Sequence, residues 1–148
     1  MYRWDRDEIL VLLVHPGGPF WSRRDLGSWS IPKGEYAPDE NPEQAALREF
    51  TEELGLKPEG QLRPLGEIVQ SGGKRVTAFA LEGDLDTTLV QSNRFVLEWP
   101  PRSGQMRSFP EVDRAAWFPL ALARQKLLPS QLPLLDRLVE TLGSRPRD

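Results

Sequence analysis

The sequence predicts a soluble α/β protein, because short strand-like runs and helical segments follow one another along a single domain's length of chain. The chain has 148 residues, of which 39% are hydrophobic and 28% are charged, a composition typical of globular proteins. At this length about two-thirds of the unfolded surface can be buried, so a core forms without disulfides. We expect residues 1–143 to form one domain and residues 144–148 to be a polar tail.

The N-terminal part predicts short strands. Residues 8–14 form an apolar run that stops at a turn-rich segment beginning at His15, which indicates a buried strand followed by a turn. We therefore expect His15 to be a turn residue and not a catalyst. Residues 1–4 leave room for only a very short strand before it, and residues 29–31 predict another short strand, which Pro32 ends.

A helix over residues 42–54 has clear start and stop signals. Asn41 suits the N-cap, Pro42 suits the first helical position, and Gln44 stands at the capping-box position. Gly55 directly after the segment is a typical helix stop.

The C-terminal part predicts further strands and two helices. A Ser-Gly-Gly turn favours a hairpin between two β-rich runs. The segment before Pro110 reads as a loop. The expected strands are residues 65–69, 75–81, 95–99 and 112–118, and the expected helices are residues 120–126 and 131–142.

One face of the helix over residues 42–54 carries three carboxylates. Glu49, Glu52 and Glu53 stand at i, i+3 and i+4, which places them within about 100° of arc. Like charges at these spacings destabilise a helix, so the face is either simply solvated or neutralised by a cation. Clustered oxygen ligands without His or Cys suit Mg²⁺ or Mn²⁺. Arg48 lies four residues before Glu52 and can orient its carboxylate.

The segment over residues 34–56 fills every defined position of a known pattern, G-x5-E-x7-R-E-U-x-E-E-x-G-U, in which U is a bulky apolar residue. These positions are held by Gly34, Glu40, Arg48, Glu49, Phe50, Glu52, Glu53, Gly55 and Leu56. The segment thus resembles the Nudix box, and the whole chain resembles a bacterial subgroup of predicted nucleoside triphosphate pyrophosphohydrolases in that family.

The resemblance implies an α/β/α sandwich around a mixed β-sheet and a hydrolase that cleaves a diphosphate linkage in a nucleoside diphosphate joined to another group. In the family, Glu49, Glu52 and Glu53 and the carbonyl of Gly34 match ligands of Mg²⁺ or Mn²⁺. Arg48 matches the arginine that orients a glutamate. The general base remains open between Glu52 and Glu53, and Glu40 matches a supporting residue.

Residues outside the box are weaker candidates. Glu111 lies where many family members carry an extra glutamate as metal ligand or base, although an ordinary exposed glutamate fits equally well. Lys33 and Arg23 are placed to hold phosphates, and Trp21 to stack on a nucleobase. We expect Trp29 to belong to the core.

Several functional questions stay open at this point. The expected substrate is a nucleoside triphosphate or a dinucleoside polyphosphate, and the alternative is a module that senses a nucleotide without cleaving it. A third possibility, removal of pyrophosphate from RNA 5′ ends, is disfavoured by a net charge of -3 and a pI of 5.3, and we expect no stable nucleic-acid partner.

The composition also sets expectations for chemistry and location. With 0 Cys and 1 His, a zinc site is improbable. The absence of a long apolar run predicts no membrane partner. We expect a cytoplasmic monomer or homodimer.

Overall fold

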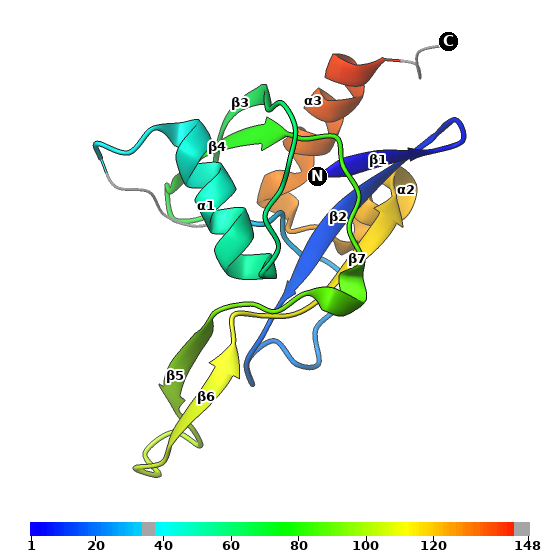
Figure 1. Cartoon of the computed structure of the whole chain (residues 1–148). Coiled ribbons are helices and arrows are strands. Elements are labelled where there is room, and N and C mark those ends of the chain that lie inside the picture. Colours follow the sequence, from blue (N-terminus) through cyan, green and yellow to red (C-terminus); the bar gives the residue numbers. More distant parts are fainter. Residues whose placement is uncertain (34–37, 144–148) are drawn as a thin grey trace.

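The computed structural model describes residues 1–33 and 38–143, and Figure 1 shows the arrangement of its elements. Two 3-10 turns, at Thr87–Leu89 and Pro129–Gln131, accompany the helices. In chain order the strands and helices are β1 (Tyr2–Asp5), β2 (Glu8–Pro16), α1 (Pro42–Leu54), β3 (Arg63–Val69), β4 (Arg75–Ala80), β5 (Arg94–Glu98), β6 (Met106–Pro110), β7 (Val112–Pro119), α2 (Leu120–Lys126) and α3 (Leu132–Leu142).

Strand β2 is the centre of the fold. It pairs antiparallel with β1 on one side and with β7 on the other, so that Val11 lies opposite both Tyr2 and Phe118. Two antiparallel hairpins, β3–β4 and β5–β6, complete the strands, and the β5–β6 hairpin extends away from the rest of the molecule (Figure 1). Isolated parallel bridges, such as Tyr2 with Glu82, make the arrangement mixed.

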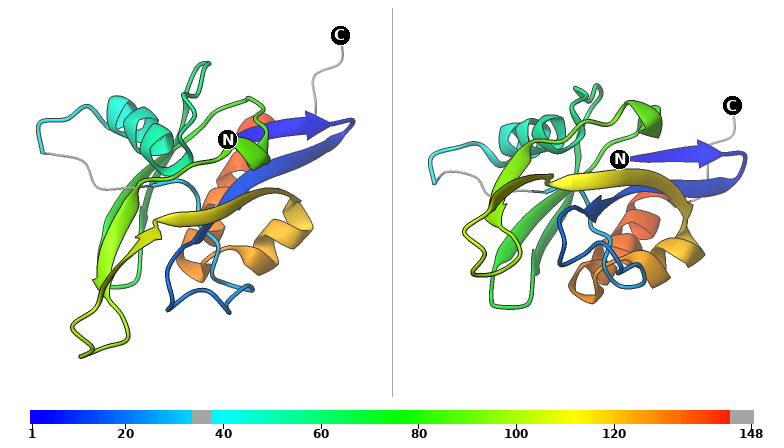
Figure 2. Two further views of the ribbon diagram at one scale, coloured as in Figure 1. Left: turned by 60° about the horizontal axis from the view of Figure 1, so that its bottom comes forward. Right: turned by 90° about the horizontal axis from the view of Figure 1, so that it is seen from below.

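Alternate residues of β2 are buried against helices on opposite faces. Leu12 and Val14 pack with Phe50 and Leu54 of α1. The other face of β2 contributes to a second cluster with α2 and α3, which contains Ile9, Val11, Leu13, Ala123, Leu127, Leu135 and Leu138. Side chains of a strand point alternately to its two faces, and the two views in Figure 2 show the helices separated by strands. The expected α/β/α sandwich is confirmed.

Helix α1 begins and ends where its sequence signals predict. The Asn41 side chain accepts hydrogen bonds from the backbone N–H groups of Glu43 (2.9 Å) and Gln44 (3.3 Å). Gly55 adopts the left-handed conformation with φ 71°, and its N–H donates to the carbonyl of Thr51 at 2.7 Å. These contacts satisfy backbone groups that a helix end otherwise leaves unpaired, and they fix the direction of the acidic face.

The structure corrects the expected loop before Pro110. Residues 106–110 form β6, which pairs with β5 from Arg94 opposite Pro110 to Glu98 opposite Met106. Its sequence, MRSFP, has no strict alternation of apolar and polar residues, and its first three residues are exposed. Its pairing with β5 therefore makes it a strand. The expected short strand at residues 29–31 is also reduced to isolated bridges.

His15 lies within β2 and not in a turn, which corrects the expectation from the sequence. It is opposite Arg114 in the ladder and fully buried. Its Nδ1 is hydrogen-bonded to Asp113 Oδ1 at 2.9 Å, and its Nε2–H donates to the carbonyl of Arg24 at 2.7 Å. Trp29 is a core residue, as expected, and is 3% exposed. His15 therefore ties the loop before Trp29 to β7.

The described residues include the whole of each helix and strand named above, and none of these helices is long and apolar enough to cross a membrane. The expected polar tail at residues 144–148 and the predicted metal ligand Gly34 lie outside the residues that the structure describes.

Candidate functional site

The acidic face of α1 comprises Glu49, Glu52 and Glu53. The helix is held against β2 through Phe50 and Leu54, which are buried. Because the three glutamates stand on a different side of the helix from these two residues, docking of α1 leaves their carboxylates at the edge of the core. All three are half-buried.

Arg48 orders this face. Its Nε and Nη2 donate to the two carboxylate oxygens of Glu40 at 2.8 Å each. Its Nη1 lies 3.2 Å from Glu52 and 3.1 Å from Glu49. The neighbouring carboxylates raise the pKa of Arg48 above its usual value, so it stays charged. The sequence predicted the contact between Arg48 and Glu52. The bidentate partner of Arg48 is Glu40, and the sequence pointed to Glu40 only through its defined position in the Nudix box.

Glu53 is held by the segment that leads into the box. Its Oε2 accepts a hydrogen bond from the backbone N–H of Lys33 at 3.1 Å. Burial is the main cause that raises the pKa of Glu53 to about 8. The charges of Glu49 and Glu111 raise this pKa further, and Lys33 lowers it. A carboxyl group with a pKa near neutrality accepts and releases protons at physiological pH.

Glu49 and Glu111 complete the group of interacting carboxylates. Burial raises the pKa of Glu49, and the charges of Glu52 and Glu111 raise it further. Arg48 has the opposite effect on this pKa. Glu111 lies between β6 and β7, where its N–H donates to the carbonyl of Asn93 at 2.8 Å. The structure thus brings Glu111, which is distant in sequence, within electrostatic range of the acidic face.

The donor chemistry of this group fits a hard divalent cation. Glu49, Glu52, Glu53 and Glu111 offer carboxylate oxygens, which are the ligands of Mg²⁺ and Mn²⁺. Within residues 1–33 and 38–143, no three acidic or histidine side chains converge closely enough to hold a metal ion. Burial raises the pKa of Glu49 and of Glu53, and neighbouring carboxylates raise both further. This repulsion is an unfavourable interaction that a bound cation would relieve.

The three residues predicted to bind substrate do not all line the same cavity. Lys33 lies beside Glu53 and contributes to a cavity next to the acidic face. Trp21 is half-buried with the Arg24 guanidinium 5.4 Å from its ring centre, and Arg23 is exposed. Neither Trp21 nor Arg23 lines that cavity among the parts of the chain that the structure describes.

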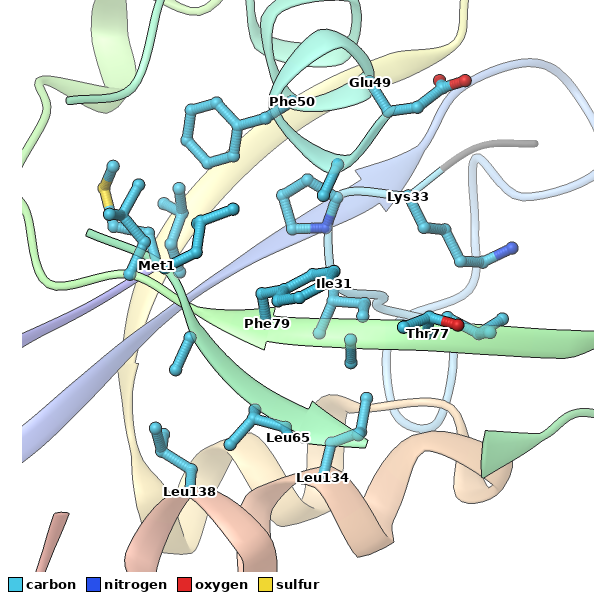
Figure 3. A pocket seen from close by; sticks show the side chains of 18 of the residues that line it. Met1, Ile31, Lys33, Glu49, Phe50, Leu65, Thr77, Phe79, Leu134 and Leu138 are labelled. Atoms are coloured by element: carbon cyan, nitrogen blue, oxygen red, sulfur yellow. The ribbon is translucent and has the colours of Figure 1, made fainter. Parts of the chain in front are cut away.

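The cavity has a volume of about 140 Å³ and lies between α1, β4 and α3. Figure 3 shows Glu49 and Lys33 on one side, with their charged ends directed outward, and Phe79, Leu65 and Leu134 deeper in the structure. The sequence offered no signal for this cavity, because its walls come from segments far apart in the chain.

Comparison with known proteins identifies the family to which this arrangement belongs. A family model described as the NUDIX domain matches residues 2–138. The chain belongs to the Nudix family.

Similar Nudix proteins match this chain over part of its length. An RNA pyrophosphohydrolase of Hahella chejuensis is 45% identical over 56 residues, which is 36% of this chain and 35% of that protein. An RNA pyrophosphohydrolase of Xylella fastidiosa is 45% identical over 51 residues, which is 34% of this chain and 27% of that protein. The matched part therefore spans between about a quarter and a third of these relatives' lengths.

Solved structures resemble this Nudix chain over nearly its whole length. The NUDIX domain of Shewanella oneidensis NrtR, complexed with ADP ribose, has a TM-score of 0.62 and 19% identity, and covers 96% of this chain and 83% of that one. A C. elegans Ap4A hydrolase binary complex has a TM-score of 0.61 and 24% identity, and covers 96% of this chain and 92% of that one. At these identities the likeness shows the fold.

Proposed function

We propose that this Nudix chain is a pyrophosphohydrolase, dependent on a divalent metal, that cleaves a diphosphate linkage in a nucleoside diphosphate joined to another group. The substrate we favour is a nucleoside triphosphate or a dinucleoside polyphosphate. The observation that carries the proposal is the acidic face of α1, which is ordered by Arg48 and electrostatically coupled to Glu111. Residues 1–143 are proposed to act as one domain.

Each residue of the site has a proposed role. Glu49, Glu52, Glu53 and Glu111, with the carbonyl of Gly34, would hold Mg²⁺ or Mn²⁺. When bound, such a cation neutralises phosphate oxygens and lowers the pKa of a coordinated water. Arg48 positions Glu52 and Glu49 through the contacts described above, and the Lys33 ammonium group attracts the substrate phosphates.

The general base is assigned to the pair Glu52 and Glu53. Glu52 is oriented by Arg48 through contacts to both carboxylate oxygens at 3.2 Å. Glu53 has a pKa of about 8, close to the value at which a group removes a proton efficiently at neutral pH. Comparing the pH–rate profiles of Glu52→Gln and Glu53→Gln distinguishes them, because loss of the base removes the acidic limb of the profile.

A second candidate substrate is the triphosphorylated 5′ end of RNA. The relatives from Hahella chejuensis and Xylella fastidiosa are named RNA pyrophosphohydrolases, and this supports testing RNA even though the net charge is -3. The expectation that no nucleic acid binds stably remains a prediction.

A substrate panel tests the proposal. The panel contains nucleoside triphosphates, dinucleoside polyphosphates, ADP-ribose and triphosphorylated RNA, each with Mg²⁺ and with Mn²⁺, and products are separated by chromatography. We expect release of a nucleoside monophosphate with at least one nucleotide, and no turnover with EDTA. Tight nucleotide binding without any cleavage would instead establish a sensing module and overturn the proposed hydrolase.

A further inference from the structure

We propose that Gln131, which lies outside the Nudix box, is a positioning residue that places Glu53 through the backbone of residues 31–33. The inference rests on the proposed function, because Glu53 is one of the proposed metal ligands. It connects the site to the turn between α2 and α3, at the opposite end of the chain from the segment that leads into α1.

The side chain of Gln131 is fully buried, although it is polar. It is 0% exposed and belongs to the 3-10 turn Pro129–Gln131. Burial of an amide group is unfavourable unless its oxygen and nitrogen have hydrogen-bond partners. Here Oε1 accepts a hydrogen bond from the N–H of Ile31 at 3.0 Å, and Nε2 donates to Ser30 Oγ at 3.0 Å. Both ends of the buried amide are therefore directed at the segment that leads into the site.

The contact with Ile31 lies where regular backbone pairing of this segment ends. Ser30 exchanges two backbone hydrogen bonds with Val14 of β2, at 2.8 and 2.9 Å. At Ile31 the acceptor of the N–H is the Gln131 side chain and not a backbone carbonyl. The Gln131 side chain thus extends the pairing of this segment by one residue toward the site.

A stiff connection joins this contact to Glu53. Pro32 has no N–H and its ring fixes φ near about −65°, and the residue before a proline is restricted to extended conformations. The next N–H along the chain is that of Lys33, which donates to Glu53 Oε2 at 3.1 Å. Because few backbone angles between Ile31 and Lys33 are free to change, the position of Ile31 determines where the N–H of Lys33 meets the carboxylate.

Gln131 is itself anchored to the core. Its backbone N–H donates to the carbonyl of Leu128 at 2.9 Å, and the N–H of Leu128 donates to the carbonyl of Trp29 at 2.8 Å. Helix α3 begins directly after Gln131 and buries Leu134, Leu135 and Leu138. Gln131 is therefore a fixed point against which residues 31–33 are placed.

Amide hydrogen exchange, measured by NMR, tests the contact in the wild-type protein. Exchange of a hydrogen-bonded amide requires local or global opening of the structure. We expect the N–H of Ile31 to exchange within about tenfold of the rate of Ser30, because both are held at the same place in the fold. Exchange of Ile31 at the rate of an unprotected amide would overturn the inference.

Two substitutions remove the contact in different ways. Gln131→Met keeps an unbranched side chain but loses both hydrogen bonds, and Gln131→Asn shortens the side chain so that its amide is out of hydrogen-bond reach of Ile31. Ile9→Ala is the matched control, because it removes a buried apolar side chain from β2. Ile9 lies about 16 Å along the strand from Val14, where residues 29–31 meet β2. Exchange rates at Ile31 and Lys33 are divided by that of Ser30 in the same protein, so that a loss of global stability cancels.

We expect both Gln131 variants to raise these two ratios at least about tenfold. We also expect them to raise the Kd for Mg²⁺, measured by calorimetry, by about 10- to 100-fold, the usual effect of losing a group that orients a metal ligand. Ile9→Ala lowers the melting temperature and leaves the ratios and the Kd unchanged.

Three results would overturn the inference. They are unchanged ratios in a folded Gln131 variant, an unchanged Kd in such a variant when the wild type binds Mg²⁺, and equal changes in Ile9→Ala. Melting curves identify a variant that fails to fold, and the other Gln131 variant then decides. If neither folds, the exchange rate of Ile31 in the wild type decides.

A failure of the proposed function gives a different result. If the wild type neither binds Mg²⁺ nor cleaves any substrate, the proposed metal site is wrong. The exchange ratio of Lys33 still shows whether Gln131 places the N–H that holds Glu53: a rise in the Gln131 variants supports this placement, and an unchanged ratio overturns it.

Discussion

At the scale of single residues, one guanidinium group controls the positions of three carboxylates. Arg48 reaches Glu40, Glu49 and Glu52 at distances between 2.8 and 3.2 Å. An exposed ion pair adds little to stability, and Arg48 is 40% exposed in its side chain. Arg48 therefore serves mainly to orient these carboxylates, because the planar guanidinium group makes several directed hydrogen bonds at once.

Arg48→Lys tests this orienting role. Lysine keeps the charge but cannot form the bidentate contact with Glu40 while it reaches Glu52. Loss of residues that orient metal ligands weakens metal affinity by about 10- to 100-fold. We expect the Mg²⁺ concentration for half-maximal activity to rise by that factor, with a smaller change in melting temperature. Arg124→Lys is the control, because Arg124 pairs with the exposed Asp136 on another part of the surface; equal effects in both variants would contradict the role.

The raised pKa of Glu53 predicts how the stability of the metal-free protein depends on pH. Its pKa rises from an ordinary value of 4.5 to about 8 in the fold. Between these values the native state therefore holds a proton that the unfolded chain has released. The free energy of unfolding must then fall as pH rises. The stabilising contribution of the protonated group is complete below pH 4.5 and is lost as pH rises through about 8.

Melting temperatures in EDTA from pH 5 to 8 measure this effect. We expect Glu53→Gln to melt with a flatter dependence on pH than the wild type, because glutamine does not titrate. Glu59→Gln serves as the control, since Glu59 is exposed in a loop and should leave the slope unchanged. Parallel curves for the wild type and Glu53→Gln would show that burial does not perturb this carboxyl.

At the scale of elements, the C-terminal end of α1 joins the helix to the segment that precedes β5. The carbonyl of Leu54 accepts the N–H of Gln91 at 2.9 Å, and the carbonyl of Glu52 accepts the N–H of Asn93 at 2.9 Å. Asn93 in turn accepts the N–H of Glu111. These contacts connect the acidic face to Glu111 through backbone alone, so the distance between them depends on this end of the helix.

Gly55→Ala disturbs that junction. A Cβ at Gly55 lies 2.4 Å from the carbonyl oxygen of Gln91 and occupies a backbone conformation with φ +71°. Gly72→Ala is the matched control, because Gly72 has φ +87° with nothing within 4 Å of an added Cβ. Both variants carry the left-handed penalty of about 1–2 kcal/mol.

We expect Gly55→Ala to lower the free energy of unfolding by about 1–3 kcal/mol more than Gly72→Ala does, which is the usual cost of an overpacked contact. Urea denaturation measures the difference. Equal losses in the two variants would mean that the approach of Gln91 to α1 does not constrain the junction.

At the scale of the whole molecule, the predictable features are those written in short stretches of sequence. The limits of α1 follow from Asn41 and Gly55, which act within one turn of the helix ends. The β3–β4 hairpin follows from its glycine turn, and the ladder runs from Arg63 opposite Ala80 to Val69 opposite Arg75. Local chemistry decides each of these features, so the sequence-based predictions are confirmed.

Features that depend on pairing between distant segments were not predictable in the same way. Strand β6 has no apolar alternation in its sequence, and it forms because it pairs with β5. The cavity needs α1, β4 and α3 to assemble around it. The proximity of Glu111 to Glu49 and Glu53 was suggested by family resemblance alone, since no property of the intervening sequence requires it. Trp21, proposed to stack on a nucleobase, and Arg23, proposed to hold phosphates, do not line the cavity, and their contacts with substrate stay predictions.

The acidic face makes a final prediction for the stability of the whole chain. A cation that binds the native state alone stabilises it by RT ln(1 + [L]/Kd), about 2.7 kcal/mol at a hundredfold excess over Kd. For a chain of this length that amounts to several degrees in melting temperature. We expect millimolar Mg²⁺ or Mn²⁺ to produce this rise and sodium at matched ionic strength to produce none. Glu52→Gln or Glu53→Gln should remove most of the gain.

The same measurement separates a metal site from a solvated acidic surface. A diffuse ion atmosphere responds to ionic strength and not to the identity of single carboxylates. Sodium and magnesium would then act alike, and the variants Glu52→Gln and Glu53→Gln would melt with the same salt dependence as the wild type. That result would remove the metal from the proposed site. The other outcome is a rise in melting temperature that requires both a divalent cation and these glutamates. That result follows only if the carboxylates of α1 act together as ligands, because each then contributes to the binding free energy that stabilises the fold.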